Sequence, residues 1–274
     1  AAVSAIEAIV LGLVQGLTEF LPISSTGHLR VVPAFLGWED PGAAFTAVVQ
    51  LGTMAAVLLY FRADLWNIGR TWLRSLRDPA ARREQEARMG WYILLGTIPI
   101  GIFGLAFKDQ IESGARSLYL IGAALVVLGL VLLLAEKVGR RERDVDSLTL
   151  RDAMIVGGAQ ALALIPGVSR SGSTITAGLF VGLNRAAAAR FSFLLSVPAV
   201  VASGLFELPT ALEGGDSTTA WALVVATALA FASGYASIAF LLRFLATHST
   251  GVFVAYRVVL GTVVLVLAAT GAIS

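Results

Sequence analysis

The sequence predicts an all-α polytopic membrane protein with six transmembrane helices and two broken re-entrant helix hairpins, arranged as an inverted-topology repeat. Three observations predict it. Hydrophobic residues make up 57% of the chain and charged residues only 14%, against roughly 25% charged in an ordinary soluble domain. The apolar runs are long and rich in Ala, Leu, Val and Gly, which indicates helices rather than the short alternating strands of an outer-membrane barrel. Two of these runs are interrupted in the same way by Pro, Ser and Gly.

The chain opens with the first hairpin, residues 3–37. It is apolar on both sides of the stretch PISSTG, which interrupts the run. A helix broken inside a bilayer leaves backbone N–H and C=O groups unpaired, and these are tolerated only where protein or a water-filled cavity satisfies them. We therefore expect a helix, a break beside a cavity, and a second helix that returns to the same side. The segment has no Lys or Arg before Arg30 and no small-residue cleavage site, so it does not read as a removable signal peptide.

Three membrane spans of about 20 apolar residues are expected to follow each hairpin. They are predicted over residues 45–61, 91–107, 118–135, 191–208, 221–242 and 252–272. Trp38, Trp91 and Trp221 lie near span ends, where aromatic anchors of membrane helices belong.

The second hairpin, residues 153–183, is predicted from its likeness to the first. QGLTEFLPISSTGH and QALALIPGVSRSGS share a Gln, then a Pro, then a cluster of small polar residues. Gln15 and Gln160 stand 145 positions apart, and Pro22 and Pro166 stand 144 apart. The chain is therefore interpreted as one membrane domain of two repeats and a linker: residues 1–136, 153–274 and 137–152. Because each half crosses the membrane three times, the second must be inverted relative to the first.

The distribution of positive charge predicts the orientation. Residues 62–88 hold seven Arg, the linker holds five Lys or Arg, and Arg185, Arg190 and Arg243 fall on the same side, which makes fifteen. The connection between the second and third spans holds only two. An excess of Lys and Arg marks the cytoplasmic side. The linker is thus expected in the cytoplasm, and both termini and the mouth of the first hairpin are expected outside.

The first break is predicted to carry a buried carboxylate. Gln15 and Glu19 are four residues apart, hence on one helix face, and Glu19 lies just before the break. A buried carboxylate is costly unless a cation compensates it, and the candidates are a metal ion, Arg170 or His28. Glu19 is therefore either a structural ion pair or part of a site. Gln15 is either a metal ligand or a helix–helix hydrogen-bonding residue.

Hydroxyl groups and a histidine follow the first break. Ser24, Ser25 and Thr26 are N-caps of the next half-helix, phosphate-binding groups or, for one of them, a nucleophile. A new helix start points its N–H groups at an anion, as phosphate sites require, and Gly27 lets the backbone approach a ligand. His28, three residues past Ser25, is better interpreted as a proton carrier or nucleophile than as a packed side chain.

Arg170 is the strongest pointer in the second break. A guanidinium at membrane depth requires an anion, and its fork suits bidentate phosphate recognition. Hydroxyls around it are either phosphate donors or caps: Ser169, Ser171, Ser173 and Thr174. Gly167 and Gly172 are expected to allow a close approach of the ligand.

At these positions the sequence resembles the undecaprenyl pyrophosphate phosphatase family, the bacitracin-resistance type. The family's first signature is E or Q, three residues, E, then PxSSTGH; here it reads QGLTE followed by PISSTGH. Its second signature, PGxSRSxxT, reads PGVSRSGST. Both signatures are long and specific, and the hydropathy layout fits over the whole chain.

That resemblance implies a membrane phosphatase that hydrolyses undecaprenyl pyrophosphate to the monophosphate carrier lipid of cell-wall synthesis. It implies a site at the outer face of the bacterial plasma membrane and a divalent cation, Mg²⁺ or Ca²⁺. The partners are the isoprenyl pyrophosphate and membrane lipids, with no nucleic acid; a homodimer is compatible with the sequence.

Carried over position by position, the resemblance implies these catalytic residues: Ser25, His28, Glu19 and Arg170. Glu19 and Gln15 match the metal-binding motif. Because Gln15 replaces one of two carboxylates, the metal would rely on Glu19, substrate oxygens and water. Ser25, helped by His28, is expected to attack the terminal phosphorus; alternatively His28 activates water, or Glu19 is the base.

The rival interpretation is a transporter or lipid flippase, because inverted repeats with broken helices are typical of secondary transporters. The second break carries no carboxylate or histidine, and this asymmetry favours one catalytic site facing outward. A membrane phosphatase that uses two histidines is disfavoured, since His248 is predicted in a cytoplasmic turn.

Overall fold

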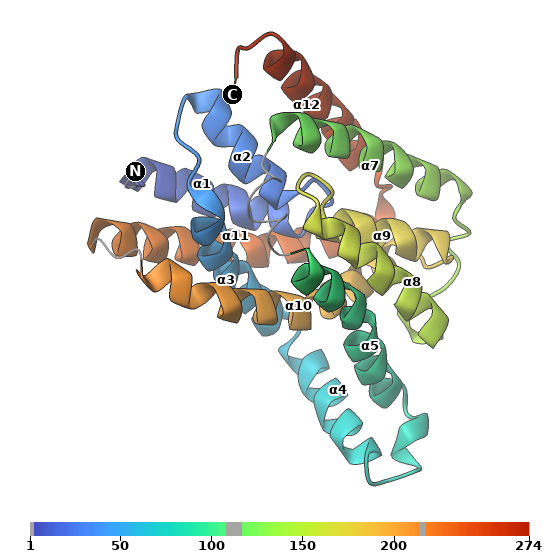
Figure 1. The fold of residues 1–274 in the computed structure, drawn as a ribbon. Coiled ribbons are helices and arrows are strands. Elements are labelled where there is room, and N and C mark those ends of the chain that lie inside the picture. Colours follow the sequence, from blue (N-terminus) through green and yellow to red (C-terminus); the bar gives the residue numbers. More distant parts are fainter. Residues whose placement is uncertain (1–2, 108–116, 214–216, 274) are drawn as a thin grey trace.

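The computed structural model describes residues 3–107, 117–213 and 217–273 (Figure 1). In these residues it is all-helical apart from one isolated bridge between Arg143 and Leu183. The first half contains α1 (Ala5–Glu19), α2 (Ser25–Leu36), α3 (Gly42–Tyr60), α4 (Arg62–Ser75), η1 (Ala81–Arg83), α5 (Gln85–Ala106) and α7 (Leu118–Val138). The second half contains η2 (Val145–Ser147), α8 (Leu150–Ala161), η3 (Leu162–Leu164), α9 (Arg170–Phe180), α10 (Arg185–Glu213), α11 (Ser217–Thr247) and α12 (Gly251–Ala269).

The predicted class, a polytopic helical membrane protein, is confirmed. Among the described residues, α5, α7, α10, α11 and α12 contain stretches long and apolar enough to cross a membrane. A sixth span results if α3 and α4 are counted together as one bent element. α10 begins at Arg185 rather than at residue 191, because the Asn184 side chain accepts a hydrogen bond from the Ala187 N–H and caps the helix.

The arginine-rich segment 62–88, which connects the first two predicted spans, contains the helix α4, which leaves α3 at an angle of 74°. One face of α4 is apolar: Leu65 and Ile68 pack against the main core. Trp72 makes an edge-to-face contact with Trp91 of α5, with ring centroids 5.5 Å apart. The contacts of these apolar side chains with α5 and the core therefore stabilise a helix within an arginine-rich connection.

The two broken hairpins use the same local devices, 145 residues apart. α1 and α8 each begin with a capping box, at Ser4 and Thr149. After each break the next helix begins behind a serine with positive φ, Ser24 at 76° and Ser169 at 73°. In Figure 1 the pair α1–α2 and the pair α8–α9 converge on the middle of the molecule. These shared caps support the repeat, and the division into two inverted halves stays a prediction.

Two glycines, again 145 residues apart, hold the first helix of each hairpin in place. A Cβ on Gly12 of α1 would lie 2.4 Å from the Ala226 carbonyl oxygen of α11. A Cβ on Gly157 of α8 would lie 2.1 Å from the Gly96 carbonyl oxygen of α5. The first helix of each hairpin is thus packed backbone to backbone against a long apolar helix, α11 or α5.

Glu136, at the end of α7, joins three elements. Its Oε1 accepts hydrogen bonds from Arg141 (2.7 Å) and from Arg185 at the start of α10, and its Oε2 accepts one from the Thr250 hydroxyl (2.7 Å) before α12. A single buried carboxylate therefore ties the linker to the starts of two spans.

The linker is also tied to the second hairpin. Arg143 donates to Asp152 of α8 at 2.7 Å. Burial alone would raise the pKa of Asp152, but hydrogen bonds from Arg143 and Thr149 hold that pKa below its usual value.

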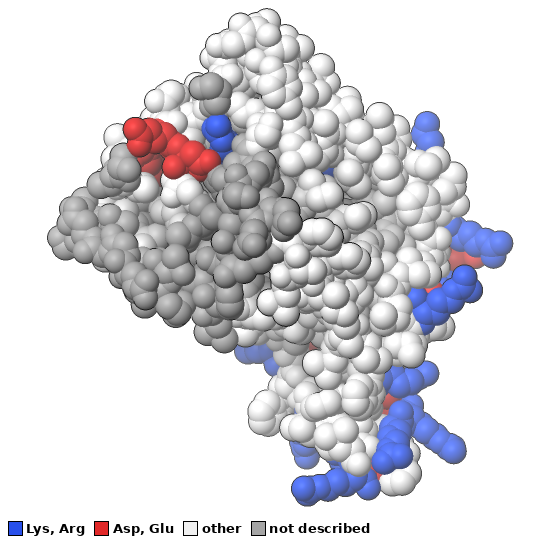
Figure 2. All heavy atoms as spheres, viewed as in Figure 1, with Lys and Arg blue, Asp and Glu red and all other residues white. Residues whose placement is uncertain are grey.

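Lys and Arg collect along one edge of the molecule, over α4 and the connection from α7 to α8 (Figure 2). This is the asymmetry that the sequence predicts for a membrane protein. Lys108 and Arg116, counted for the opposite side, lie outside the described residues.

Candidate active site

The two breaks meet at the carboxylate of Glu19. Its Oε2 accepts hydrogen bonds from Gln15 Nε2 (2.9 Å) and Ser25 Oγ (2.5 Å), both of the first hairpin. Its Oε1 accepts one from Arg170 of the second hairpin, 151 residues along the chain. Of the three cations considered for Glu19, the structure therefore provides Arg170.

These groups are buried and lie at helix ends. Glu19 and Ser25 are each 8% exposed, and the Arg170 side chain is 14% exposed. Glu19 is the last residue of α1, Ser25 the first of α2 and Arg170 the first of α9. The N-terminal ends of two half-helices thus flank one ion pair, and their dipoles add to the attraction for an anion.

The serines before the two half-helices are caps. Ser24 Oγ accepts the Gly27 N–H at 3.3 Å, and Ser169 Oγ accepts the Gly172 N–H at 3.1 Å. Thr26 is exposed, with its hydroxyl 3.3 Å from that of Ser24. The capping alternative is therefore observed for Ser24 and Ser169, whose own hydroxyl protons remain able to donate.

The other hydroxyls of the second break have structural partners. Ser171 Oγ donates to the carbonyl oxygen of Leu21 at 3.0 Å and so joins the second break to the first. Ser173 and Thr174 donate to the Arg170 carbonyl oxygen, at 3.0 and 2.7 Å. Ser173 and Thr174, predicted as phosphate ligands, are thus turned into α9 rather than toward the Glu19 carboxylate.

His28 is held by its two ring nitrogens. Nδ1 lies 2.7 Å from the Ser24 carbonyl oxygen, which can only accept, so Nδ1 carries the proton in the neutral ring. Nε2 then accepts from the Tyr256 hydroxyl of α12, also at 2.7 Å, and the two rings stack 5.6 Å apart. Among the described residues no hydrogen bond joins His28 to Ser25, so the predicted pairing of these two is not seen.

Arg257 of α12 joins the two breaks to α7, a role that was not predicted from the sequence. It is fully buried, and no carboxylate pairs with it in the described part of the chain. Its guanidinium donates to five carbonyl oxygens, two on α7, one in the first break and two in the second: Ala124, Leu125, Pro22, Gly167 and Val168. A lone Arg within an apolar span was the available signal.

The glycines of the breaks have packing roles. Gly167 has a φ of +90°, and a Cβ there would lie 2.7 Å from the Ile121 carbonyl oxygen. A Cβ on Gly172 would lie 2.6 Å from Arg257 Nη1, whereas one on Gly27 would meet Ser24 Oγ at 3.2 Å. The lack of a side chain at Gly167 and Gly172 therefore allows the close approach of α7 and of Arg257. These contacts explain the two glycines without a ligand.

Oxygen atoms suited to a divalent cation lie beside Glu19. Gln15 Oε1 is buried and has no hydrogen-bond partner, and the Glu19 carboxylate lies one helical turn away. Among the described residues, no group of three or more His, Asp or Glu side chains is placed to hold a metal ion. Glu19 and Gln15 therefore fit a hard cation that takes its remaining ligands from substrate and water.

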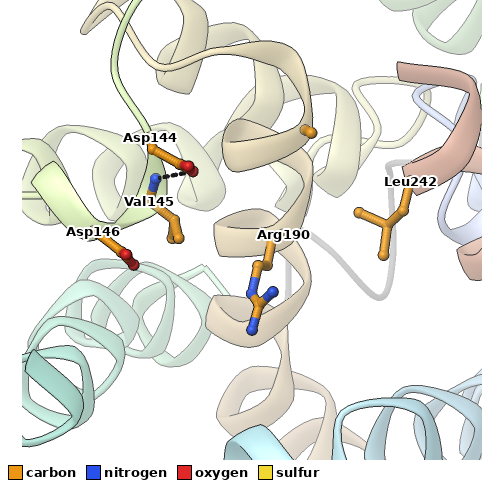
Figure 3. A pocket seen from close by; sticks show the side chains of 6 residues that line it. Asp144, Val145, Asp146, Arg190 and Leu242 are labelled. Carbon is orange, nitrogen blue, oxygen red and sulfur yellow. Dashed lines mark hydrogen bonds between the residues drawn. The ribbon is translucent and has the colours of Figure 1, made fainter. Parts of the chain in front are cut away.

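A cavity of about 460 Å³ lies away from the breaks, on the basic edge (Figure 3). It is lined by Asp144, Val145, Asp146, Ala186, Arg190 and Leu242. None of the residues predicted for the site lines it.

Comparisons with known proteins match almost the whole chain. Residues 8–263 match the family described as bacitracin resistance protein BacA. An undecaprenyl-diphosphatase of a Nocardioides species is 54% identical over 270 residues, which cover 98% of both chains. The undecaprenyl-diphosphatase of Myxococcus xanthus is 55% identical over 275 residues, 99% of this chain and 91% of that protein. The one of Mycolicibacterium smegmatis is 54% identical over 272 residues, 98% of each.

Proposed function

The chain belongs to the family of the bacitracin resistance protein BacA, and from this premise we propose that it hydrolyses undecaprenyl diphosphate to undecaprenyl phosphate and inorganic phosphate. The observation that carries the proposal is the convergence of Ser25, Arg170 and Gln15 on the Glu19 carboxylate. This arrangement offers a nucleophile, a proton acceptor and a phosphate-binding cation within one buried cluster.

The site is proposed to work at the outer face of the bacterial plasma membrane, where it returns the carrier lipid to cell-wall synthesis. The support is the charge asymmetry: fifteen Lys and Arg residues of the sequence are predicted on one side, opposite the predicted mouth of the first hairpin. With that orientation the termini lie outside.

Arg170 is proposed to bind the diphosphate. Its guanidinium presents several N–H donors in one plane, which matches two phosphate oxygens at once. The neighbouring N-termini of α2 and α9 favour the same negative charge. These groups would stabilise the charge that develops on the oxygen between the two phosphates as its bond to the terminal phosphorus breaks.

Ser25 is proposed as the nucleophile. Its hydroxyl already donates to Glu19 Oε2, so the proton it loses on attacking the terminal phosphorus has an acceptor in place. The lipid monophosphate leaves, and water then releases phosphate from the serine. Glu19 is preferred over His28 as the base for Ser25, because among the described residues only Glu19 is hydrogen-bonded to the Ser25 hydroxyl.

A divalent cation, Mg²⁺ or Ca²⁺, is proposed at Glu19 and Gln15. It would neutralise the charge of the diphosphate. Gln15 Oε1, buried without a partner, supports its place there.

His28 is proposed to move protons through Nε2, with Tyr256 as its positioning residue. Tyr256→Phe removes the donor to Nε2 but keeps the ring that stacks on His28. One hydrogen bond contributes about 1.4 kcal/mol here, so kcat is expected to fall about tenfold while KM stays unchanged. Steady-state kinetics on purified protein measure this.

Tyr119→Phe is the matched control, since Tyr119 donates its hydroxyl to the Ala268 carbonyl oxygen outside the site. Equal kcat values for the Tyr256→Phe and Tyr119→Phe proteins would refute a role for Tyr256 in the reaction.

The experiment that tests the proposed function is phosphate release from an isoprenyl diphosphate by the protein in detergent, with Mg²⁺, with Ca²⁺ or with a chelator. Detergent removes the two compartments that transport requires. Cation-dependent release supports the phosphatase and the metal. No release by folded protein with any cation would contradict the phosphatase, whereas release in the chelator would contradict only the metal.

A further inference from the structure

The exposed face of α4 combines apolar and basic side chains in a way that the reaction does not explain. Trp66 is 71% exposed and Leu73 is 60% exposed, although both are large and apolar. Arg70, four residues after Trp66 and three before Leu73, lies on the same face of the helix, and Arg77 follows in the turn just after α4 ends at Ser75. The opposite face packs on the core and α5. α4 is therefore amphipathic, with its mixed face turned outward.

Four of the seven arginines in residues 62–88 have no side-chain partner in the described part of the chain. Arg62 donates to the Leu59 carbonyl oxygen, Arg74 pairs with Glu84, and Arg82 donates to the Ser75 carbonyl oxygen. The other four make no hydrogen bond or ion pair through their side chains with any described residue: Arg70, Arg77, Arg83 and Arg88. These four guanidinium groups are therefore able to bind an anionic group of another molecule.

α4 projects from the body of the molecule together with the first turns of α5, at the basic edge (Figure 1). Near its start, Asp64 accepts a hydrogen bond from Arg190 of α10 at 2.7 Å. Gln85, the first residue of α5, donates to Asp146 of the linker at 2.5 Å. The start of α4 and the start of α5 are thus both joined to the edge over which the Lys and Arg spheres gather (Figure 2).

We propose that α4 is an interfacial helix that binds the anionic phospholipids of the membrane leaflet at the basic edge. Trp66 and Leu73 enter the boundary between headgroups and acyl chains, as the apolar face of such helices does. Arg70 and Arg77 extend their side chains to the lipid phosphates. A soluble anion would match the arginines but would leave the two exposed apolar side chains unexplained. The proposal does not rest on the enzymatic function.

The test compares two double variants of the full-length protein in detergent. Phosphatidylglycerol or phosphatidylcholine is titrated in, and bound lipid is counted by native mass spectrometry. The variant R70Q/R77Q is expected to bind phosphatidylglycerol about 30-fold more weakly, since each Arg near an anionic lipid surface contributes about fivefold. The control R140Q/R151Q removes the same charge from exposed arginines outside α4 and is expected to bind like the wild type.

A second measurement tests the apolar half of the proposal and does not depend on those variants. In vesicles that contain phosphatidylglycerol with brominated chains, Trp66→Phe should remove a quenched component of the tryptophan fluorescence. The proposal is overturned if R70Q/R77Q and R140Q/R151Q bind phosphatidylglycerol equally, or if Trp66→Phe leaves the quenched fraction unchanged. Should R70Q/R77Q fail to fold, the quenching result decides.

Discussion

Replacing Glu19 with glutamine is expected to lower phosphate release by about a thousandfold. Glutamine keeps the size of the side chain, but its amide cannot take the proton of Ser25 and leaves Arg170 without its carboxylate. Loss of a proton acceptor at a reacting group typically costs a factor of about 10² to 10⁴. The rate is measured as phosphate released from an isoprenyl diphosphate by purified protein.

Glu86→Gln is the matched control, because Glu86 is exposed on α5 and the change in charge is the same. It should retain the wild-type rate. A Glu19→Gln protein that elutes as a single species and keeps more than a tenth of the wild-type rate would exclude Glu19 as the centre of the site.

Replacing Arg257 with methionine is expected to produce the largest loss of stability. Methionine fills part of the space but leaves the carbonyl oxygens of Pro22, Gly167 and Val168 without their donor, whereas those of Ala124 and Leu125 still accept within α7. Each buried acceptor without a partner costs about 1–3 kcal/mol, so the loss of three such partners should lower the free energy of unfolding by at least about 3 kcal/mol. Thermal unfolding in detergent should show a much lower midpoint.

Arg243→Met, which removes an exposed arginine of α11, controls for the loss of charge and should unfold near the wild-type temperature. The unfolding midpoint of Arg257→Lys should lie between those of the wild type and Arg257→Met, since one ammonium group can donate to three acceptors at most. If Arg257→Met unfolded together with Arg243→Met, the breaks would not depend on Arg257.

Much of the architecture could be predicted because a membrane restricts what a chain can do. Pro, Ser and Gly inside an apolar run indicate a broken helix, because few other structures are tolerated in a membrane. The breaks before Ser25 and Arg170 lie where the repeat predicts them. The approach of Arg170 to Glu19 was one of three stated alternatives, since a buried carboxylate requires a cation.

What could not be predicted depends on contacts between elements far apart in the chain. In the sequence of α12, Tyr256 looks like an interfacial aromatic residue and Arg257 like an isolated charge. Only the folded structure places Tyr256 against His28 and Arg257 against both breaks. α4 was missed for another reason. The seven arginines of residues 62–88 predict a cytoplasmic connection, whereas the helical spacing of Leu65, Ile68 and Trp72 is the signal that would have predicted a helix.

The central claim is that residues of the two breaks act as one catalytic unit, and a double-variant cycle tests it most directly. Phosphate release would be measured with ³²P-labelled isoprenyl diphosphate for Glu19→Gln, Arg170→Gln and the variant with both changes. Groups that work as a unit give losses that do not multiply, so the double variant should be no more than about threefold slower than the slower single variant. A double variant slower by the product of the two single losses would mean that Glu19 and Arg170 act independently, and would contradict one shared site.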